Sequence, residues 1–184
     1  MVGTIEINGT GGIIEGNLGT AAVNVNQDAV YDFDGVNDYI DCGNGSDLQM
    51  GTGDFSFGAW IKRSANDGED TVISYGDASD DPRWYIRFNS GTNDLQLVID
   101  DTDGAVAVPQ ANTAITDTLW HHVFITLDRS ESDGAKMYID GVLDATGDQS
   151  ASSKTLTHSS DGILIGARRD TSATAFFNGN IRDV

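Results

Sequence analysis

Apolar and polar residues alternate with a period of two along several stretches of this 184-residue chain. The clearest stretch is FSFGAWIK at 55–62, where Phe55 and Ile61 fall on one face and Trp60 and Lys62 on the other. Such alternation is typical of a strand that buries one of its two faces. The same pattern predicts further strands over 94–100, 121–128, 136–140, 162–167 and 175–181.

Turn-forming dipeptides separate these stretches. Asp-Gly occurs at six places between residues 34 and 162, and Asn-Gly occurs at 8–9, 44–45 and 178–179. Both dipeptides tolerate the positive φ that tight hairpins require. No window of helical length shows an apolar stripe with a 3.6-residue period. The sequence therefore predicts an all-β protein, either a sandwich or a jelly roll.

Residues 1–27 differ from the rest of the chain. They contain short strand-like runs and many Gly and Asn, but few large apolar side chains. We interpret them as an N-terminal arm or edge strand, which precedes one compact domain over residues 28–184. A domain of that length is long enough to bury a substantial core.

The chain is strongly acidic, with 29 Asp and Glu against 10 Lys and Arg and a formal net charge of −19. Of the acids, 25 are Asp, which suits turns, and four are Glu, which suits helices. Nucleic acids and anionic membranes both require clustered basic residues, so we expect neither as a partner. No stretch has the length and apolarity of a membrane-spanning helix, and the N-terminus has no signal-peptide pattern. The single cysteine, Cys42, excludes an intrachain disulfide, and alternation predicts that its thiol is buried.

Six motifs follow one another in the order found in laminin G-like domains. They are FDGVNDYIDCG at 33–43, DFSFGAWIKR at 54–63, WHHVFITLD at 120–128, KMYIDGVL at 136–143, ILIGA at 163–167 and FNGNIRDV at 177–184. On these motifs the chain resembles the laminin G-like domains of the concanavalin A-like lectin/glucanase superfamily. The resemblance implies two antiparallel sheets packed as a jelly-roll β-sandwich, but it implies no single function. Such domains usually continue past the last motif, so the closing strand is shortened, completed by a partner chain or lost by truncation.

The resemblance also implies a structural calcium ion, since many relatives have one between the N-terminal part of the domain and the acid before the last strand. By that analogy Asp183 is one ligand, and Asp34 or Asp38 supplies another. Carboxylate clusters in loops are suitable calcium ligands. The alternative is that these aspartates only form turns, which already explains their positions.

Catalysis is not expected. Glycosidases of this fold carry Glu and Asp at alternate positions of one strand, which aims the carboxylates into one cleft. No such strand occurs here, because Glu6 and Glu15 lie in the arm and Glu69 and Glu131 lie in loops. The adjacent His121 and His122 would point to opposite faces of a strand, so they cannot both bind one metal ion.

The stretch YGDASDDPRWYIRF at 75–88 is the candidate recognition surface. Alternation buries Trp84, Ile86 and Phe88 and leaves the neighbouring side chains outward. Exposed aromatic rings stack on sugars, and arginine bonds hydroxyl or carboxylate groups. The ligand-binding residues predicted on this basis are Tyr75, Arg83, Tyr85 and Arg87. The loop Arg168–Asp170 is a second candidate rim.

These observations favour a non-catalytic recognition, adhesion or structural module on an extracellular or virion surface. A chain that starts with Met and has no export signal fits a phage capsid decoration or tail-fibre protein, whose arm would pair with neighbouring subunits in a homo-oligomer. The alternative is a glycan-binding module of a larger secreted protein, with a cell-surface glycan or protein as partner. A polysaccharide hydrolase is the third hypothesis.

Overall fold

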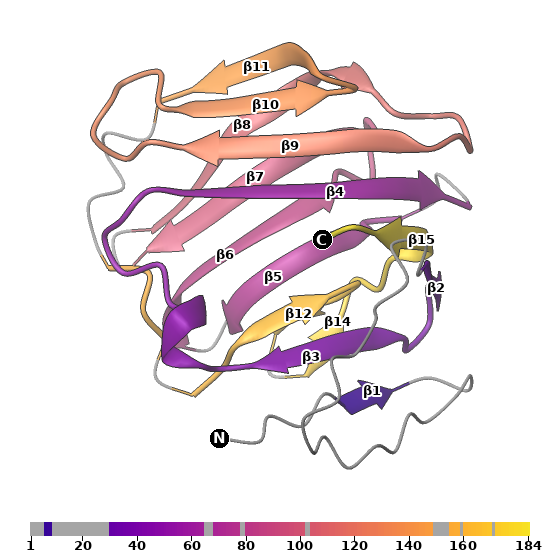
Figure 1. Ribbon diagram of the computed structural model, residues 1–184, viewed down its shortest axis with the longest axis horizontal. Coiled ribbons are helices and arrows are strands. Elements are labelled where there is room, and N and C mark those ends of the chain that lie inside the picture. Colours follow the sequence, from indigo (N-terminus) through magenta and orange to yellow (C-terminus); the bar gives the residue numbers. More distant parts are fainter. Residues whose placement is uncertain are drawn as a thin grey trace, which may run out of the picture.

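Two antiparallel sheets face each other, and the strands of one sheet lie across those of the other (Figure 1). The computed structural model describes residues 6–8, 30–64, 68–77, 80–101, 104–148, 155–158, 160–170 and 172–184. The predicted all-β jelly-roll sandwich is confirmed. Among the described residues, none forms a helix with the length and apolarity needed to cross a membrane.

Strand pairing sets the order of the strands across each sheet. The seven-stranded sheet contains, from one edge to the other, β1 (Glu6–Asn8), β3 (Tyr39–Gly43), β12 (Ile163–Ile165), β5 (Thr71–Asp77), β6 (Asp80–Phe88), β7 (Asp94–Asp101) and β8 (Gly104–Ala114). The six-stranded sheet contains, in the same manner, β11 (Val142–Gly147), β10 (Ala135–Ile139), β9 (His121–Leu127), β4 (Phe55–Arg63), β15 (Asn178–Arg182) and β2 (Tyr31–Asp34). The remaining elements are a 3₁₀ helix η1 (Ser46–Leu48) and the paired short strands β13 (Arg168–Arg169) and β14 (Ala173–Thr174).

The core fills the space between the sheets and takes every second residue of most strands. Val123, Ile125 and Leu127 of β9 are buried, and they pack with the inward residues of β4 and β10. From the other sheet, Trp84, Ile86 and Phe88 of β6 enter the same core, as alternation predicts.

Local turn chemistry fixes the β10–β11 hairpin. Asp140 and Gly141 have φ of 52° and 80°, and two successive positive φ values are the signature of the tight turn that matches strand twist. At β3 the prediction for Cys42 is wrong, because its thiol is exposed. Gly43 pairs with Ile163 and Asp41 with Leu164, which leaves Cys42 as the extra residue of a bulge.

Glu6–Asn8 is the described part of the predicted arm, and it forms the edge strand β1. It pairs antiparallel with Tyr39–Asp41 of β3. The other residues of 1–27 lie outside the described ranges, so the division of the chain at residue 28 stays a prediction.

A buried ion pair links the two sheets. Arg63, at the end of β4, is 1% exposed and donates to Oδ2 of Asp70 through Nε at 2.9 Å and Nη2 at 2.6 Å. Asp70 precedes β5 and is 3% exposed. Nη1 of Arg63 also donates to Oδ1 of Asn93 and to the carbonyl of Ile115, and the guanidinium lies 4.2 Å from the ring centroid of Phe88.

We predict that Arg63→Met lowers the free energy of unfolding by about 3–5 kcal/mol, because it leaves a buried carboxylate without its cation. Urea unfolding followed by fluorescence measures the change. The double variant Arg63→Met, Asp70→Leu is expected to lose less than the sum of the two single changes. A loss below about 1 kcal/mol for Arg63→Met would show that the pair does not hold the sheets together.

Candidate functional site

The predicted recognition residues separate onto the two faces of the seven-stranded sheet. The prediction that Tyr75 points outward is wrong, since this residue is fully buried. It pairs with Trp84 in the β5–β6 register, so both rings point into the core. The Tyr75 hydroxyl accepts a hydrogen bond from the backbone N–H of His158 at 2.7 Å.

The other three predicted residues lie together on the outer side of the sheet, where Arg83 and Arg87 are partly exposed. The prediction that the ring of Tyr85 is exposed is wrong, because Tyr85 is only 6% exposed. The guanidinium carbons of Arg83 and Arg87 lie 5.4 Å and 5.5 Å from the ring centroid of Tyr85, and that of Arg168 lies at 5.0 Å. Distances of this size allow cation–π attraction. Arg168 comes from β13, so Arg168 and Asp170 of the loop predicted as a second rim lie beside the same ring, whereas Arg169 pairs with Asp41 and Asp161. We name Tyr85 and the three arginines around its ring, with Glu69, Asp100 and Asp170, the Tyr85 cluster.

Carboxylates hold the three guanidinium groups of the Tyr85 cluster. Arg83 contacts Asp100 at 3.0 Å and Asp170 at 2.9 Å, and Arg87 contacts Glu69 at 2.9 Å. Arg168 donates to Asp170 at 2.6 Å and also pairs with Glu69. Three arginines therefore face three acids, and the cluster is close to electrically neutral.

One acid of the cluster, Asp170, is held in its charged form. Burial raises the pKa of the Asp170 carboxyl, but the hydrogen bond and charge of Arg168 and the hydrogen bond from Thr174 outweigh it, so this pKa lies below 3.8. Burial opposes the charge of Arg168 as well, yet Asp170 and Glu69 outweigh it and raise the pKa of Arg168 above its ordinary value. The Arg168–Asp170 ion pair therefore persists across the neutral pH range.

Side chains on the neighbouring strands continue this polar surface. Nε of Arg87 donates to Gln96 on β7 at 3.2 Å, and Gln96 donates to Gln110 on β8 at 2.9 Å. Gln110 in turn donates to Asp94 at 2.9 Å. The outer face thus presents a row of hydrogen-bonding groups from β6 to β8.

The predicted calcium ligands do not form one site. β2 and β15 pair with Asp34 opposite Asn178 and Tyr31 opposite Ile181. Asp183 lies two residues beyond Ile181, so it is about five residues, roughly 16 Å, from the level of Asp34. A calcium ion reaches its ligands at about 2.3–2.6 Å, so it cannot join them.

The aspartates of the β2–β3 loop serve the turn itself. Oδ1 of Asp34 accepts the backbone N–H groups of Val36 and Asn37 at 2.8 Å and 3.2 Å, which lowers the pKa of Asp34. Oδ2 of Asp38 accepts the N–H of Asp34 at 3.1 Å. Within the described ranges, no group of three or more His, Cys, Asp or Glu side chains is arranged to hold a metal ion.

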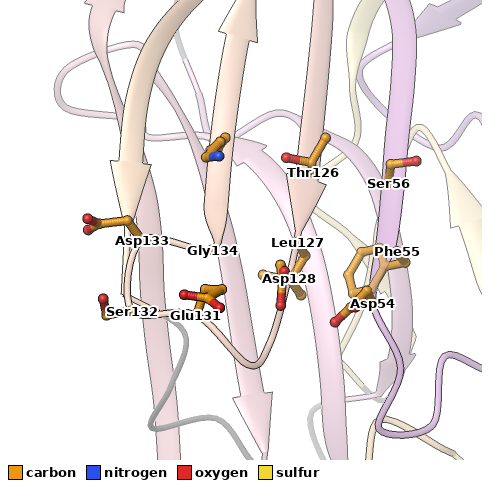
Figure 2. A pocket seen from close by; sticks show the side chains of 11 residues that line it. Asp54, Phe55, Ser56, Thr126, Leu127, Asp128, Glu131, Ser132, Asp133 and Gly134 are labelled. Atoms are coloured by element: carbon orange, nitrogen blue, oxygen red, sulfur yellow. The ribbon is translucent and has the colours of Figure 1, made fainter.

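A hollow of about 650 Å³ lies where β4 begins and β9 ends. Figure 2 shows Asp54, Asp128 and Glu131 around its floor, with Ser56 and Thr126 on the strands beside it. Asp54 accepts the N–H of Arg129 at 2.9 Å, and Asp128 accepts from Ser130 through its N–H at 3.0 Å and its hydroxyl at 2.7 Å. These bonds stabilise the β9–β10 loop.

His121, at the start of β9, lies between two carboxylates. Its Nδ1 is 2.8 Å from Asp140 and its Nε2 is 2.9 Å from Asp117. Both ring nitrogens donate only when the imidazole is charged. Burial lowers the pKa of His121, but the hydrogen bonds to Asp117 and Asp140 outweigh this and raise it above 6.5.

Comparison with known proteins places this fold in a family. A model of the concanavalin A-like lectin/glucanases superfamily, of the laminin G type, matches residues 34–184. The chain therefore belongs to this superfamily. No curated protein matches the sequence.

Several solved structures share the fold at low identity. The CBM40 module of the Ruminococcus gnavus IT-sialidase, bound to α2,3-sialyllactose, has a TM-score of 0.59 at 15% identity, covering 84% of this chain and 90% of that one. Domains LG4-5 of the mouse laminin α1 chain give 0.60 at 13%, covering 83% and 40%. The binding domain of botulinum neurotoxin serotype D gives 0.61 at 16%, covering 84% and 37%.

We predict that His121→Gln lowers the melting temperature, and that the difference between the native protein and the variant becomes smaller as pH rises. A raised histidine pKa stabilises the fold fully below about 6.5 and loses this effect as pH passes through the higher folded value. The pKa values of Asp117 and Asp140 are lowered, so their contribution is present above about 4 and lost in stronger acid. Melting temperatures of both proteins at about pH 6 and about pH 9 test this. A gap that stays constant would contradict the charged-histidine interpretation.

We predict that Asp183→Asn leaves thermal unfolding unchanged both in calcium and in chelator. Asp183 is exposed, its φ of 52° suits asparagine, and it lies far from Asp34. A ligand that binds only the folded protein raises the melting temperature, so the two buffers report calcium binding. A calcium-dependent rise that disappears in Asp183→Asn would restore the sequence-based calcium site.

Proposed function

We propose that this protein is a non-catalytic carbohydrate-recognition module that binds hydroxyl groups of a glycan at the Tyr85 cluster. The observation that carries the proposal is the balanced ring of three arginines and three acids around Tyr85 on an outer sheet face. Sugar hydroxyls both donate and accept hydrogen bonds, so a surface with paired donors and acceptors suits them. A ligand carboxylate would instead have to displace one of the resident acids.

The comparisons support this class of function. The CBM40 module with the same fold has sialyllactose bound, and the botulinum neurotoxin domain is a binding domain by name. The identities are 13–16%, so they support the fold and the class of module but not the ligand.

Display on an extracellular or virion surface is the second part of the proposal. The acidic surface suits a soluble particle-bound or secreted module and disfavours nucleic acid. A structural virion subunit is the competing function. Light scattering separates the two, because a stable symmetric oligomer that binds no sugar would favour the structural subunit.

We predict that Arg83→Gln weakens glycan binding by roughly 10- to 100-fold. A hydrogen bond to a charged group contributes about 1.5–3 kcal/mol, and about 1.4 kcal/mol corresponds to a tenfold change in affinity. A printed array of neutral and acidic oligosaccharides identifies the ligand, and calorimetry measures its affinity for native and variant protein.

Arg169→Gln is the matched control. Arg169 and Arg83 both have 17% exposed side chains, and both bond two aspartates, but Arg169 bonds Asp41 and Asp161. The two changes therefore remove similar ion pairs, and only one of them touches Tyr85. Equal losses of binding would mean that the Tyr85 cluster is not the site.

A further inference from the structure

The outer face of the six-stranded sheet carries a band of aromatic side chains. Strand register places Leu143, Tyr138 and Phe124 in one row across β11, β10 and β9. The next row runs across β9, β4 and β15 and contains His122, Trp60 and Arg182. We name these six residues, together with Trp120, the aromatic band.

Ring contacts show that the band is continuous. The centroids of Trp60 and His122 are 5.3 Å apart, and those of Phe124 and Tyr138 are 6.3 Å apart. The guanidinium of Arg182 lies 4.9 Å from Trp120 and 5.4 Å from Trp60, which holds both indoles in place. Because β11 to β15 spans four strand spacings, the band is about 19 Å long.

Polar rows border the band on both sides. One row contains Ser56, Thr126, Lys136 and Thr146. The other contains Lys62, Asn180 and Asp32. Ser56 and Thr126 also border the carboxylate-lined hollow (Figure 2). The surface is thus apolar along its centre and hydrogen-bonding at its edges.

The charge of the protein limits which class of ligand the aromatic band can bind. The chain's net charge of −19 repels a second copy and repels an anionic polymer. A cationic partner would find no carboxylate to bind within the band, and the positive charge of Arg182 would repel it. The hollow beside the band is lined by four carboxylates as well as by Phe55 and Leu127, so an apolar anchoring side chain of a protein partner would meet charged groups there.

We infer that the aromatic band binds a neutral polysaccharide chain laid across the strands. Pyranose rings have an apolar C–H face, which stacks on the band, and hydroxyl edges, which the two polar rows bond. This inference relies on the proposed function only for the class of ligand. The band and the Tyr85 cluster lie on opposite outer faces of the sandwich, so one molecule would bridge two glycan chains.

Affinity electrophoresis tests the inference. Native gels contain hydroxyethylcellulose, xyloglucan, galactomannan, laminarin or dextran, and an alginate gel serves as the anionic comparison. We expect at least one neutral polymer to retard the native protein and alginate not to retard it. Trp60→Ala and Tyr138→Ala should each weaken the affinity for that polymer, as measured from the retardation, roughly tenfold, equivalent to about 1.4 kcal/mol. Val142→Ser, which removes an exposed apolar side chain outside the band, should leave it unchanged.

Arg83→Gln separates this inference from the proposed function. Retardation lost in Trp60→Ala but kept in Arg83→Gln supports the band whether or not the Tyr85 cluster binds sugar. The reverse pattern overturns the band and supports the Tyr85 cluster. Migration of the native protein unchanged by all five neutral polymers also overturns the band.

Acrylamide quenching is a second measurement that does not depend on how Trp60→Ala folds. Trp60 and Trp120 are surface residues, whereas Trp84 is 1% exposed. The retarding polymer should therefore protect native tryptophan emission from acrylamide. Unchanged quenching would mean that the polymer does not cover the indoles.

Discussion

The buried pairing of Arg63 with Asp70 is the constraint on which the rest of this sandwich depends. It joins the end of β4 in one sheet to the start of β5 in the other, and the same guanidinium reaches Asn93 and the carbonyl of Ile115. Groups 7, 30 and 52 residues further along the chain therefore converge on the charge of Arg63. Because a buried charge must keep its partners, this contact fixes how the two sheets align.

Most strands bury one face in the core, so only the two outer faces of the sandwich can bind a ligand. The side chains on these two faces differ. The seven-stranded sheet carries charged groups that neutralise one another around Tyr85. The six-stranded sheet carries aromatic rings bordered by polar side chains. A sandwich built in this way displays two independent surfaces on opposite sides of one core.

Strands with one polar face were predictable, and the strands buried on both faces were not. β4, β9 and β10 show the alternation that the sequence predicts. All seven residues of β5 are buried, since the segment around β13 covers its outer side and Ser74 donates to the carbonyl of Ala167. A strand buried on both sides loses its period-two signal. For that reason the orientation of Tyr75 was predicted wrongly.

The residues of the candidate site were also only partly predictable from the sequence. Arg83, Tyr85 and Arg87 were predictable as outward residues because they alternate with Trp84 and Ile86 along β6. Nothing local indicated that Arg168, 81 residues beyond Arg87, would approach the same ring, or that Glu69 would pair with both arginines. Likewise, the calcium prediction from Asp34 and Asp183 depended on spatial proximity, which the β2–β15 register removes.

The sequence by itself determined the fold class, the turns and the inward or outward sense of most strand residues, because these follow from local backbone preferences and the burial of apolar side chains. The tertiary structure alone decided which outward residues meet, since contacts between distant strands depend on sheet order and register. Gly179 shows the difference: its Asn-Gly dipeptide is a turn signal in sequence, yet it lies within β15. A Cβ there would come within 2.1 Å of the carbonyl oxygen of Lys62 on β4, so the neighbouring strand requires a glycine.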